Sequence, residues 1–234
     1  MAACLHRHDM AGAVGASKAH LGKILGTPET RPLDEDGKRT SDLRLEMTNG
    51  RLPADFAKLL GCNTIGMHIG FVPHDQNDPL YAQIVAVTRE VCDYIKQNGQ
   101  QLNLETGQES ADGLLAFIGD VQRDNLFINF DPANMILYGT GEPIAALKKV
   151  GKYVRSVHCK DGKWAKNPGQ EWGQEVPLGQ GDVGMENYLR TLKEIGYTGP
   201  LTIEREIPQD PVRQKAEIGG ALELLSSLKK KILS

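Results

Sequence analysis

Five segments of the sequence end in a side chain that can titrate or bind a metal ion. Each segment is a short, mostly apolar run with the polar residue at its carboxyl end: His68 in MHIGF, Glu105 in NLETG, Asp131 in NFDPAN, His158 in VHCKD and Glu204 in TIERE. If these runs are parallel strands, their ends lie at one rim of a sheet and the side chains converge. Three carboxylates at one rim repel one another unless a cation lies between them. The pattern therefore predicts a site for a divalent cation.

The donor types narrow the choice of metal. An oxygen-rich set with one histidine favours Mn²⁺ or Mg²⁺, with Co²⁺ and Zn²⁺ also compatible. Taken singly, each residue has a structural alternative: Asp131 precedes Pro132 and could cap a helix, and His68 and His158 could be buried core residues. The recurrence of such residues at successive strand ends is what favours the metal site.

Apolar runs alternate with amphipathic stretches from about residue 62 onward, as successive βα units do. The expected strands are Thr64–Phe71, Gln101–Glu105, Leu126–Asp131, Tyr153–His158 and Leu201–Glu204. The expected helices are Leu80–Asn98, Ala111–Val121 with Ser110 as N-cap, Pro143–Gly151, Met185–Ile195 and Pro211–Leu233. This order predicts a parallel sheet covered by helices, either a barrel or an open doubly wound sheet.

The amino-terminal part does not fit this pattern. Residues 1–51 contain no clear strand, and only one helix is expected there, around Ser41–Leu60. An eight-stranded βα barrel usually takes about 250 residues, and this chain has 234 residues. We therefore expect a parallel TIM-barrel-like α/β fold that is incomplete, with about five recognisable strands and no evident first three. Residues 1–51 would form an irregular segment and residues 52–234 the barrel region.

Composition excludes several classes of partner. A net charge of −3 provides no basic field for nucleic acid. The four cysteines form no CxxC pair, which is typical of reduced thiols in a cytoplasmic protein. The opening residues contain no sustained apolar stretch, so we expect neither a signal peptide nor a membrane partner. The glycines of LGQGDVG follow too short an apolar run for a dinucleotide site, and we expect them to shape a loop.

Several motifs resemble one known family. NLETG, NFDPANM, VHCKDGKW, LGQGDV and GYTGPLTIEREI are similar to the second half of the xylose isomerase-like TIM-barrel superfamily of sugar phosphate isomerases and epimerases. The resemblance covers roughly residues 52–233, as the last five βα units of that barrel. It implies that Glu105, Asp131, His158 and Glu204 are the metal ligands. It also implies that Glu105 and Glu204 are the catalytic acid and base.

The resemblance extends to the substrate. It implies that His68 and Lys160 face it. Asn134 and Trp164 stand where the tagatose-epimerase branch has a histidine and an arginine that hold a ketose. We expect both residues to contact the substrate, but the sugar specificity of that branch does not transfer. Lys160 beside Asp161 is equally compatible with an ordinary ion pair.

The expected reaction is a metal-dependent proton transfer next to the carbonyl of a sugar or sugar phosphate. It would pass through a cis-enediolate and give isomerisation or epimerisation. Three alternatives stay open: a sugar or inosose dehydratase, a phosphodiester-cleaving enzyme disfavoured by the net charge of −3, and a non-catalytic barrel remnant that binds metal or ligand. The sequence also leaves the oligomeric state open, a homo-oligomer included.

Overall fold

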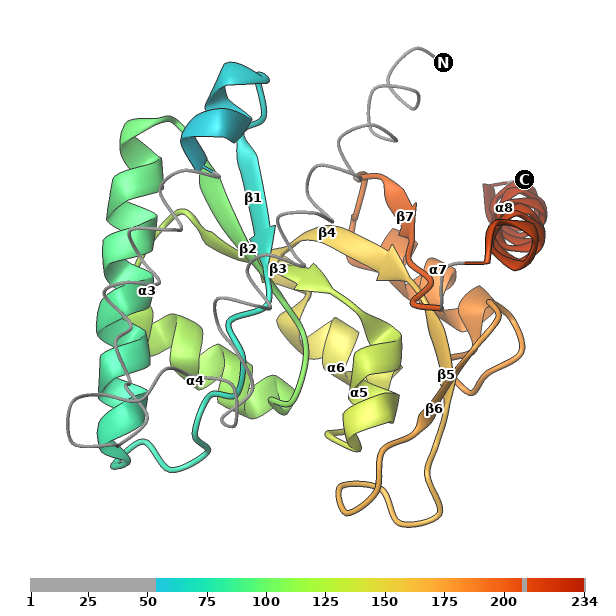
Figure 1. The fold of residues 1–234 in the computed structure, drawn as a ribbon, viewed down its shortest axis with the longest axis horizontal. Coiled ribbons are helices and arrows are strands. Elements are labelled where there is room, and N and C mark those ends of the chain that lie inside the picture. Colours follow the sequence, from blue (N-terminus) through green and yellow to red (C-terminus); the bar gives the residue numbers. More distant parts are fainter. Residues whose placement is uncertain (1–53, 208–209, 234) are drawn as a thin grey trace.

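The computed structural model describes residues 54–207 and 210–233, and its main feature is one sheet of five strands (Figure 1). The strand order is β1-β2-β3-β4-β7, and every neighbouring pair is parallel. The strands are β1 (Thr64–Met67), β2 (Gln101–Glu105), β3 (Leu126–Phe130), β4 (Val154–Cys159) and β7 (Leu201–Ile203). The sheet curls into a half-barrel, which confirms the predicted TIM-barrel-like fold.

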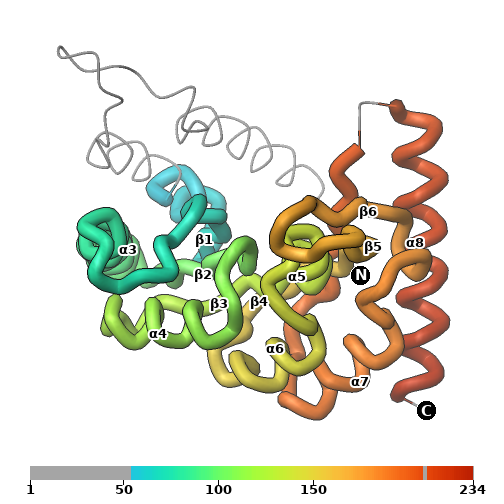
Figure 2. The backbone as a smooth tube through the Cα atoms, turned by 90° about the horizontal axis from the view of Figure 1, so that it is seen from below, coloured from blue at the N-terminus to red at the C-terminus, as the bar shows by residue number. Residues whose placement is uncertain are grey.

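Helices follow the strands along the chain. They are α3 (Pro79–Gln97), α4 (Ala111–Val121), α5 (Pro132–Tyr138), α6 (Pro143–Val150), α7 (Met185–Glu194) and α8 (Pro211–Leu233). Figure 2 shows α3, α4, α6 and α7 following one another around one side of the sheet, with α8 beyond α7. Within the described residues, no helix has the length and apolar character needed to cross a membrane.

Helix α4 illustrates how local sequence sets these elements. The Ser110 side chain accepts a hydrogen bond from the Gly113 N–H and so caps the first turn. The helix ends at Val121, and the C-cap residue Gln122 adopts a left-handed conformation with φ of 53°. Its buried side chains recur at helical spacing on one face: Leu114, Phe117, Ile118 and Val121.

The two faces of the central strands differ sharply in chemistry. The side chains toward the helices are apolar and at most 2% exposed: Leu102, Leu104, Ile128 and Phe130. Burial of each such side chain contributes about 1.5–3 kcal/mol. The alternate side chains on the concave face are polar and also buried: Asn103, Glu105, Asn129 and Asp131. Strand alternation thus builds a hydrophobic core on one side and a polar interior on the other.

Three local predictions differ from the structure. Strand β1 ends at Met67 instead of Phe71, and the chain turns at Gly70, where φ is 81°. Helix α5 was not expected after β3. The loop after β4 contains an unpredicted antiparallel hairpin of β5 (Asp161–Lys163) and β6 (Gln174–Val176).

The sheet is open at both ends in the part of the chain that the structure describes. Strands β1 and β7 each pair on one side only. An eight-stranded barrel needs three further strands, and residues 54–207 and 210–233 do not supply them. Most of the helix expected around residues 41–60 lies outside the described residues, and residues 54–59 of it are helical. The predicted irregular segment 1–51 also lies outside them.

Candidate metal centre

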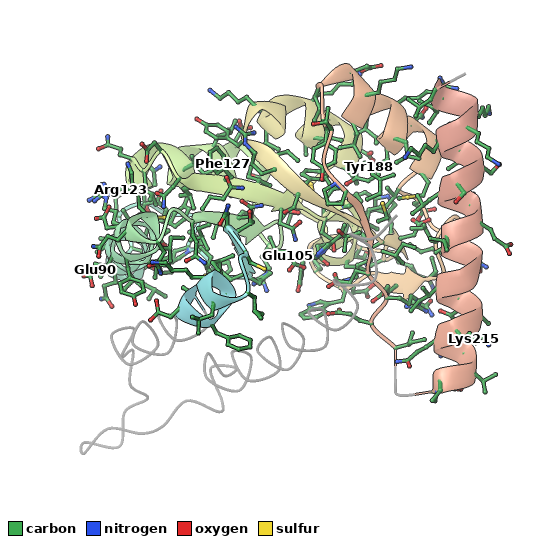
Figure 3. All side chains as sticks on the ribbon, turned by 90° about the horizontal axis from the view of Figure 1, so that it is seen from above. Glu90, Glu105, Arg123, Phe127, Tyr188 and Lys215 are labelled. Atoms are coloured by element: carbon green, nitrogen blue, oxygen red, sulfur yellow. The ribbon has the colours of Figure 1, made fainter. Side chains whose placement is uncertain are left out.

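Four of the predicted side chains meet at the carboxyl ends of four strands. Glu105 ends β2, Asp131 follows β3, His158 lies in β4 and Glu204 follows β7. Each offers one potential ligand atom, and these atoms all lie within 4.8 Å of one another. Figure 3 shows Glu105 near the middle of the molecule, far from Glu90 on α3 and Lys215 on α8. The convergence predicted from the strand ends is therefore present.

A bulge in the pairing of β3 with β4 brings His158 to the concave face. Ile128 pairs with Val154, but the next residue, Asn129, pairs with Ser156. Arg155 is the extra residue. Because side chains alternate along a strand, this shift of one residue moves the following side chains of β4 to the opposite face. Without it, His158 would point toward the helices.

His158 faces carboxylates with one ring nitrogen and an amide with the other. Nδ1 lies 3.1 Å from Glu204, 3.3 Å from Asp131 and 3.6 Å from Glu105. Nε2 lies 3.0 Å from Nδ2 of Asn129. Burial alone lowers the pKa of His158, but hydrogen bonds to the three carboxylates raise it well above its ordinary value. The carboxylates therefore favour positive charge at this point, which is what a metal ion supplies.

Asp131 divides its two carboxylate oxygens between two tasks. Oδ1 accepts hydrogen bonds from the backbone N–H groups of Ala133 at 2.9 Å and Asn134 at 3.1 Å, and so caps α5. Oδ2 lies 3.3 Å from Nδ1 of His158. Burial raises the pKa of the fully buried Asp131, although His158 and Lys160 oppose the shift. Asp131 is thus a helix cap and also a member of the cluster.

Lys160 lies beside the cluster with its side chain 2% exposed. Its Nζ is 3.2 Å from Glu204 and 3.2 Å from Glu206. Burial lowers the pKa of Lys160, but the neighbouring carboxylates, with Asp131 the largest contributor, raise it above its ordinary value. The neighbouring carboxylates therefore favour the charged ammonium form of the side chain. Its partners are these carboxylates and the side-chain oxygen of Asn134. The Asp161 carboxylate instead accepts backbone N–H groups.

Asn134 links the two sides of the cluster. Its Nδ2 donates to Glu105 at 3.2 Å and to the Thr106 carbonyl at 3.0 Å. Its Oδ1 accepts from Lys160 at 3.3 Å. Both ends of the amide are used within the protein, so Asn134 holds Glu105 and Lys160 in place. The predicted contact of Asn134 with substrate stays a prediction.

His68 and Trp164 make contacts outside the four-residue cluster. Nδ1 of His68 accepts from the Gly70 N–H at 3.0 Å, and a side chain at Gly107 would overlap its Nε2. His68 therefore lies against the segment that follows β2. The indole of Trp164 packs against the hydrophobic core, and its backbone N–H donates to Asp182 at 3.0 Å. Their roles in substrate binding stay predictions.

Asp161 organises the glycine-rich loop that follows the hairpin. Its carboxylate accepts from the backbone N–H groups of Gly162, Gly179, Gly181 and Val183 at 2.9–3.2 Å. A side chain at Gly181 would overlap this carboxylate. The glycines let the backbone approach closely enough to be bound, which agrees with the expected loop-shaping role. The loop is thereby fixed to the start of β5.

The sequence analysis missed three residues around the centre. Asn129 contacts His158, and Glu206 contacts Lys160. Burial raises the pKa of the Tyr138 hydroxyl, and Lys160, Glu206 and Glu105 are close enough to act on it electrostatically. Glu206 lies two residues after Glu204 in TIERE, and this spacing could have indicated it. Tyr138 could not have been found, because its place depends on the unpredicted α5.

The fold and the cluster define a class of protein, a parallel α/β half-barrel with a candidate divalent-metal centre at the carboxyl ends of its strands. The sequence matches the xylose isomerase-like TIM barrel family over residues 40–230, and the chain belongs to this family. This confirms the resemblance seen in the motifs.

Three known proteins show how close the similarity is. One solved structure is that of a xylose isomerase domain protein from Planctomyces limnophilus, whose sequence is 59% identical to this chain. The match covers 81% of this chain and 68% of that one, with a TM-score of 0.79. An L-ribulose 3-epimerase from Methylomonas sp. (strain DH-1) is 27% identical over 154 residues, which cover 61% of this chain and 48% of the epimerase. The structure of the IOLI protein with a bound zinc atom has a TM-score of 0.65 over 86% of this chain and 73% of that one; at 20% identity it shows the fold alone.

The match covers part of these relatives. The chain spans 59% and 48% of the lengths of the first two curated relatives. The comparisons therefore establish the family and the fold, and the activity of this chain is a matter for proposal.

Proposed function

We propose that this chain is a divalent-metal-dependent isomerase or epimerase of a sugar or sugar phosphate. One observation carries the proposal: three carboxylates and an imidazole, from four different strand ends, have ligand atoms within 4.8 Å of one another. Glu105, Asp131, His158 and Glu204 would hold the ion. The oxygen-rich set suits Mn²⁺ or Mg²⁺ and is also compatible with Co²⁺ and Zn²⁺. A bound divalent ion would supply Lewis acidity that makes the carbon next to a carbonyl easier to deprotonate.

Glu105 and Glu204 are the proposed acid and base. They come from β2 and β7, which flank β3 and β4 in the sheet, so they approach the centre from two sides. A carboxylate that gives one oxygen to an ion keeps a second oxygen for proton transfer. One glutamate would remove the proton beside the carbonyl, and the other would return it. Return to the same carbon on its other face gives epimerisation, and return to the adjacent carbon gives isomerisation.

Lys160 supplies a fixed positive charge next to one member of this pair. Its ammonium group lies 3.2 Å from Glu204, so the two side chains form an ion pair. It would also attract the negative charge that develops on the substrate oxygens. Asn134 keeps Lys160 in place on the side of the cluster that faces Glu105. His68 and Trp164 are proposed as outer contacts of the substrate.

The substrate class rests on the family and on one relative. The family is named for a sugar isomerase, and a relative that is 27% identical over part of its length is named L-ribulose 3-epimerase. These names support a ketose or aldose as substrate. They do not select one sugar or its phosphorylation state.

Hydrogen exchange tests the proposal across a whole range of candidate sugars. The full chain, loaded with Mn²⁺, would be incubated in D₂O with a panel of ketoses, aldoses and their phosphates. We expect a carbon-bound deuterium in at least one sugar, and loss of this exchange in Glu204→Gln. The matched control is Glu223→Gln, an exposed glutamate on α8.

The outcomes separate the alternatives. Exchange that persists in Glu204→Gln would contradict the two-glutamate mechanism. Mn²⁺ binding with no exchange in any sugar would point to a metal-binding protein without this activity. Loss of water from a sugar would instead identify a dehydratase.

A further inference from the structure

We propose that Asn129 is a positioning residue of this centre, which fixes the ring orientation and the tautomer of His158. The inference rests on the proposed function because it concerns the same metal centre. It assigns a role to a buried residue that lies behind the four candidate ligands and is not one of them.

The geometry places Asn129 directly behind the imidazole. Asn129 lies in β3, two residues before Asp131, and is 7% exposed. Its Nδ2 lies 3.0 Å from Nε2 of His158, the ring nitrogen that points away from the carboxylates. The bulge pairs Asn129 with Ser156, so from this point paired side chains of β3 and β4 lie on the same face of the sheet. The local irregularity of the sheet therefore aligns the amide with the ring.

The amide controls what the opposite ring nitrogen can do. A neutral imidazole carries one N–H group, and only its unprotonated nitrogen can bind a metal ion. For Nδ1 to face the ion with its lone pair, the proton must lie on Nε2 and needs an acceptor. The carbonyl oxygen of an asparagine side chain is such an acceptor. A group that holds the outer N–H of a metal-binding histidine orients the ring and raises its affinity for the ion.

An asparagine can serve both states of the centre. In the structure the amide nitrogen lies 3.0 Å from Nε2, where it can donate to a lone pair on this ring nitrogen. A half-turn of the amide brings its oxygen to Nε2 instead, which suits Nδ1 as a ligand. A carboxylate at this position would accept only, and an aliphatic side chain would do neither.

Asn103 provides a matched control within the same sheet. It lies in β2, two residues before Glu105, on the same concave face, and is fully buried. Its amide donates to Ser156 at 2.9 Å and accepts from Gln101 at 3.3 Å. It therefore resembles Asn129 in burial and chemistry, but its hydrogen bonds do not involve the imidazole.

The test measures Zn²⁺ and Mn²⁺ affinity of the full chain by calorimetry in four variants: Asn129→Leu, Asn129→Asp, Asn103→Leu and Asn103→Asp. We expect Asn129→Leu to bind about 10–100-fold more weakly than the parent and Asn103→Leu to stay close to it. Asn129→Asp restores an acceptor for Nε2, so it should bind at least as tightly as the parent. Asn103→Asp adds the same charge elsewhere, so tighter binding in Asn129→Asp than in Asn103→Asp isolates the hydrogen bond.

A second readout reports the ring itself. Imidazole ¹⁵N chemical shifts of His158, assigned with His158→Gln, are measured at a pH above its folded pKa, where the ring is neutral. They should show a changed tautomer balance in Asn129→Leu and the parent balance in Asn103→Leu. Parent affinity and unchanged shifts in Asn129→Leu would overturn the inference, as would equal losses in the two leucine variants. A parent that binds neither ion, but whose shifts depend on Asn129, would contradict the proposed function and leave the positioning role supported.

Discussion

The double role of Asp131 predicts that two substitutions at this position will separate metal binding from helix capping. Asp131→Asn keeps an oxygen that can accept from the Ala133 and Asn134 N–H groups but replaces the other oxygen with an amide nitrogen. Asp131→Ala removes both oxygens. We expect both variants to lose metal binding. Only Asp131→Ala should lose the cap of α5 as well.

The magnitudes follow from the contacts. Loss of an N-cap costs about 0.5–2 kcal/mol, which corresponds to roughly 2–4 °C of Tm per kcal/mol for a chain of this size. A metal ion at 100 times its Kd stabilises the parent by about 2.7 kcal/mol, and a variant with 100-fold weaker binding gains only about 0.4 kcal/mol.

Thermal unfolding with Mn²⁺ and with chelator measures both effects. Asp131→Asn should abolish most of the metal-induced rise in Tm, and Asp131→Ala should lower the chelator Tm below that of Asp131→Asn. A full metal-induced rise in Asp131→Asn would refute the ligand role. Equal chelator Tm values for the two variants would refute the capping role.

Three further predictions concern charge and burial. The pKa of His158 is raised in the fold. Its protonated form therefore contributes fully to the stability of the ion-free fold below the unfolded pKa of about 6.5. This contribution is lost as the pH rises through the folded pKa. In chelator, the difference in unfolding free energy between parent and His158→Gln should therefore shrink with rising pH, and a constant or growing difference would contradict this. Burial raises the pKa of Cys92 and Cys159 to about 12. When the folded protein is alkylated at pH 8 and its peptides are mapped, the half-buried Cys62 should be labelled well before either of them. Early labelling of Cys159 would refute its burial. Lys160→Met leaves buried carboxylates without their cation. Urea unfolding in chelator should show a free energy of unfolding lower by about 3–5 kcal/mol, and Zn²⁺ should partly restore it. An equal loss with and without Zn²⁺ would argue against a shared site.

Sequence reasoning succeeded where one physical rule was sufficient. Continuous apolar runs predicted the five strands, and parallel pairing then brought Glu105, Asp131, His158 and Glu204 to one rim. Neither step depends on the details of side-chain packing, because the direction of a parallel strand decides where its end lies.

Elements that depend on tertiary contacts were not predicted. Helix α5 is only seven residues long, and its signals were limited to Asp131 as N-cap and Pro132 in the first turn. Strands β5 and β6 have three residues each and show no clear alternation. Such short elements form because α5 and the hairpin pack against each other, as in the 2.8 Å hydrogen bond from the Gly173 N–H to the Leu137 carbonyl.

The sequence analysis did not predict which side chains of β4 face the core and which face the concave side. Val154 and Val157 both face the core although they are three residues apart, which breaks the alternation of a regular strand. This spacing was a signal for the bulge, but the pairing of Asn129 with Ser156 is visible only in the folded sheet. The contact between Asn129 and His158 depends on that pairing.

The most direct test of the account is anomalous diffraction from crystals of the full chain grown with Zn²⁺. We predict one anomalous peak in the cluster, at about 2.0–2.2 Å from a ligand atom of each of Glu105, Asp131, His158 and Glu204. A cluster without a peak, or a peak within this distance of only two of the four side chains, would contradict the proposed metal centre.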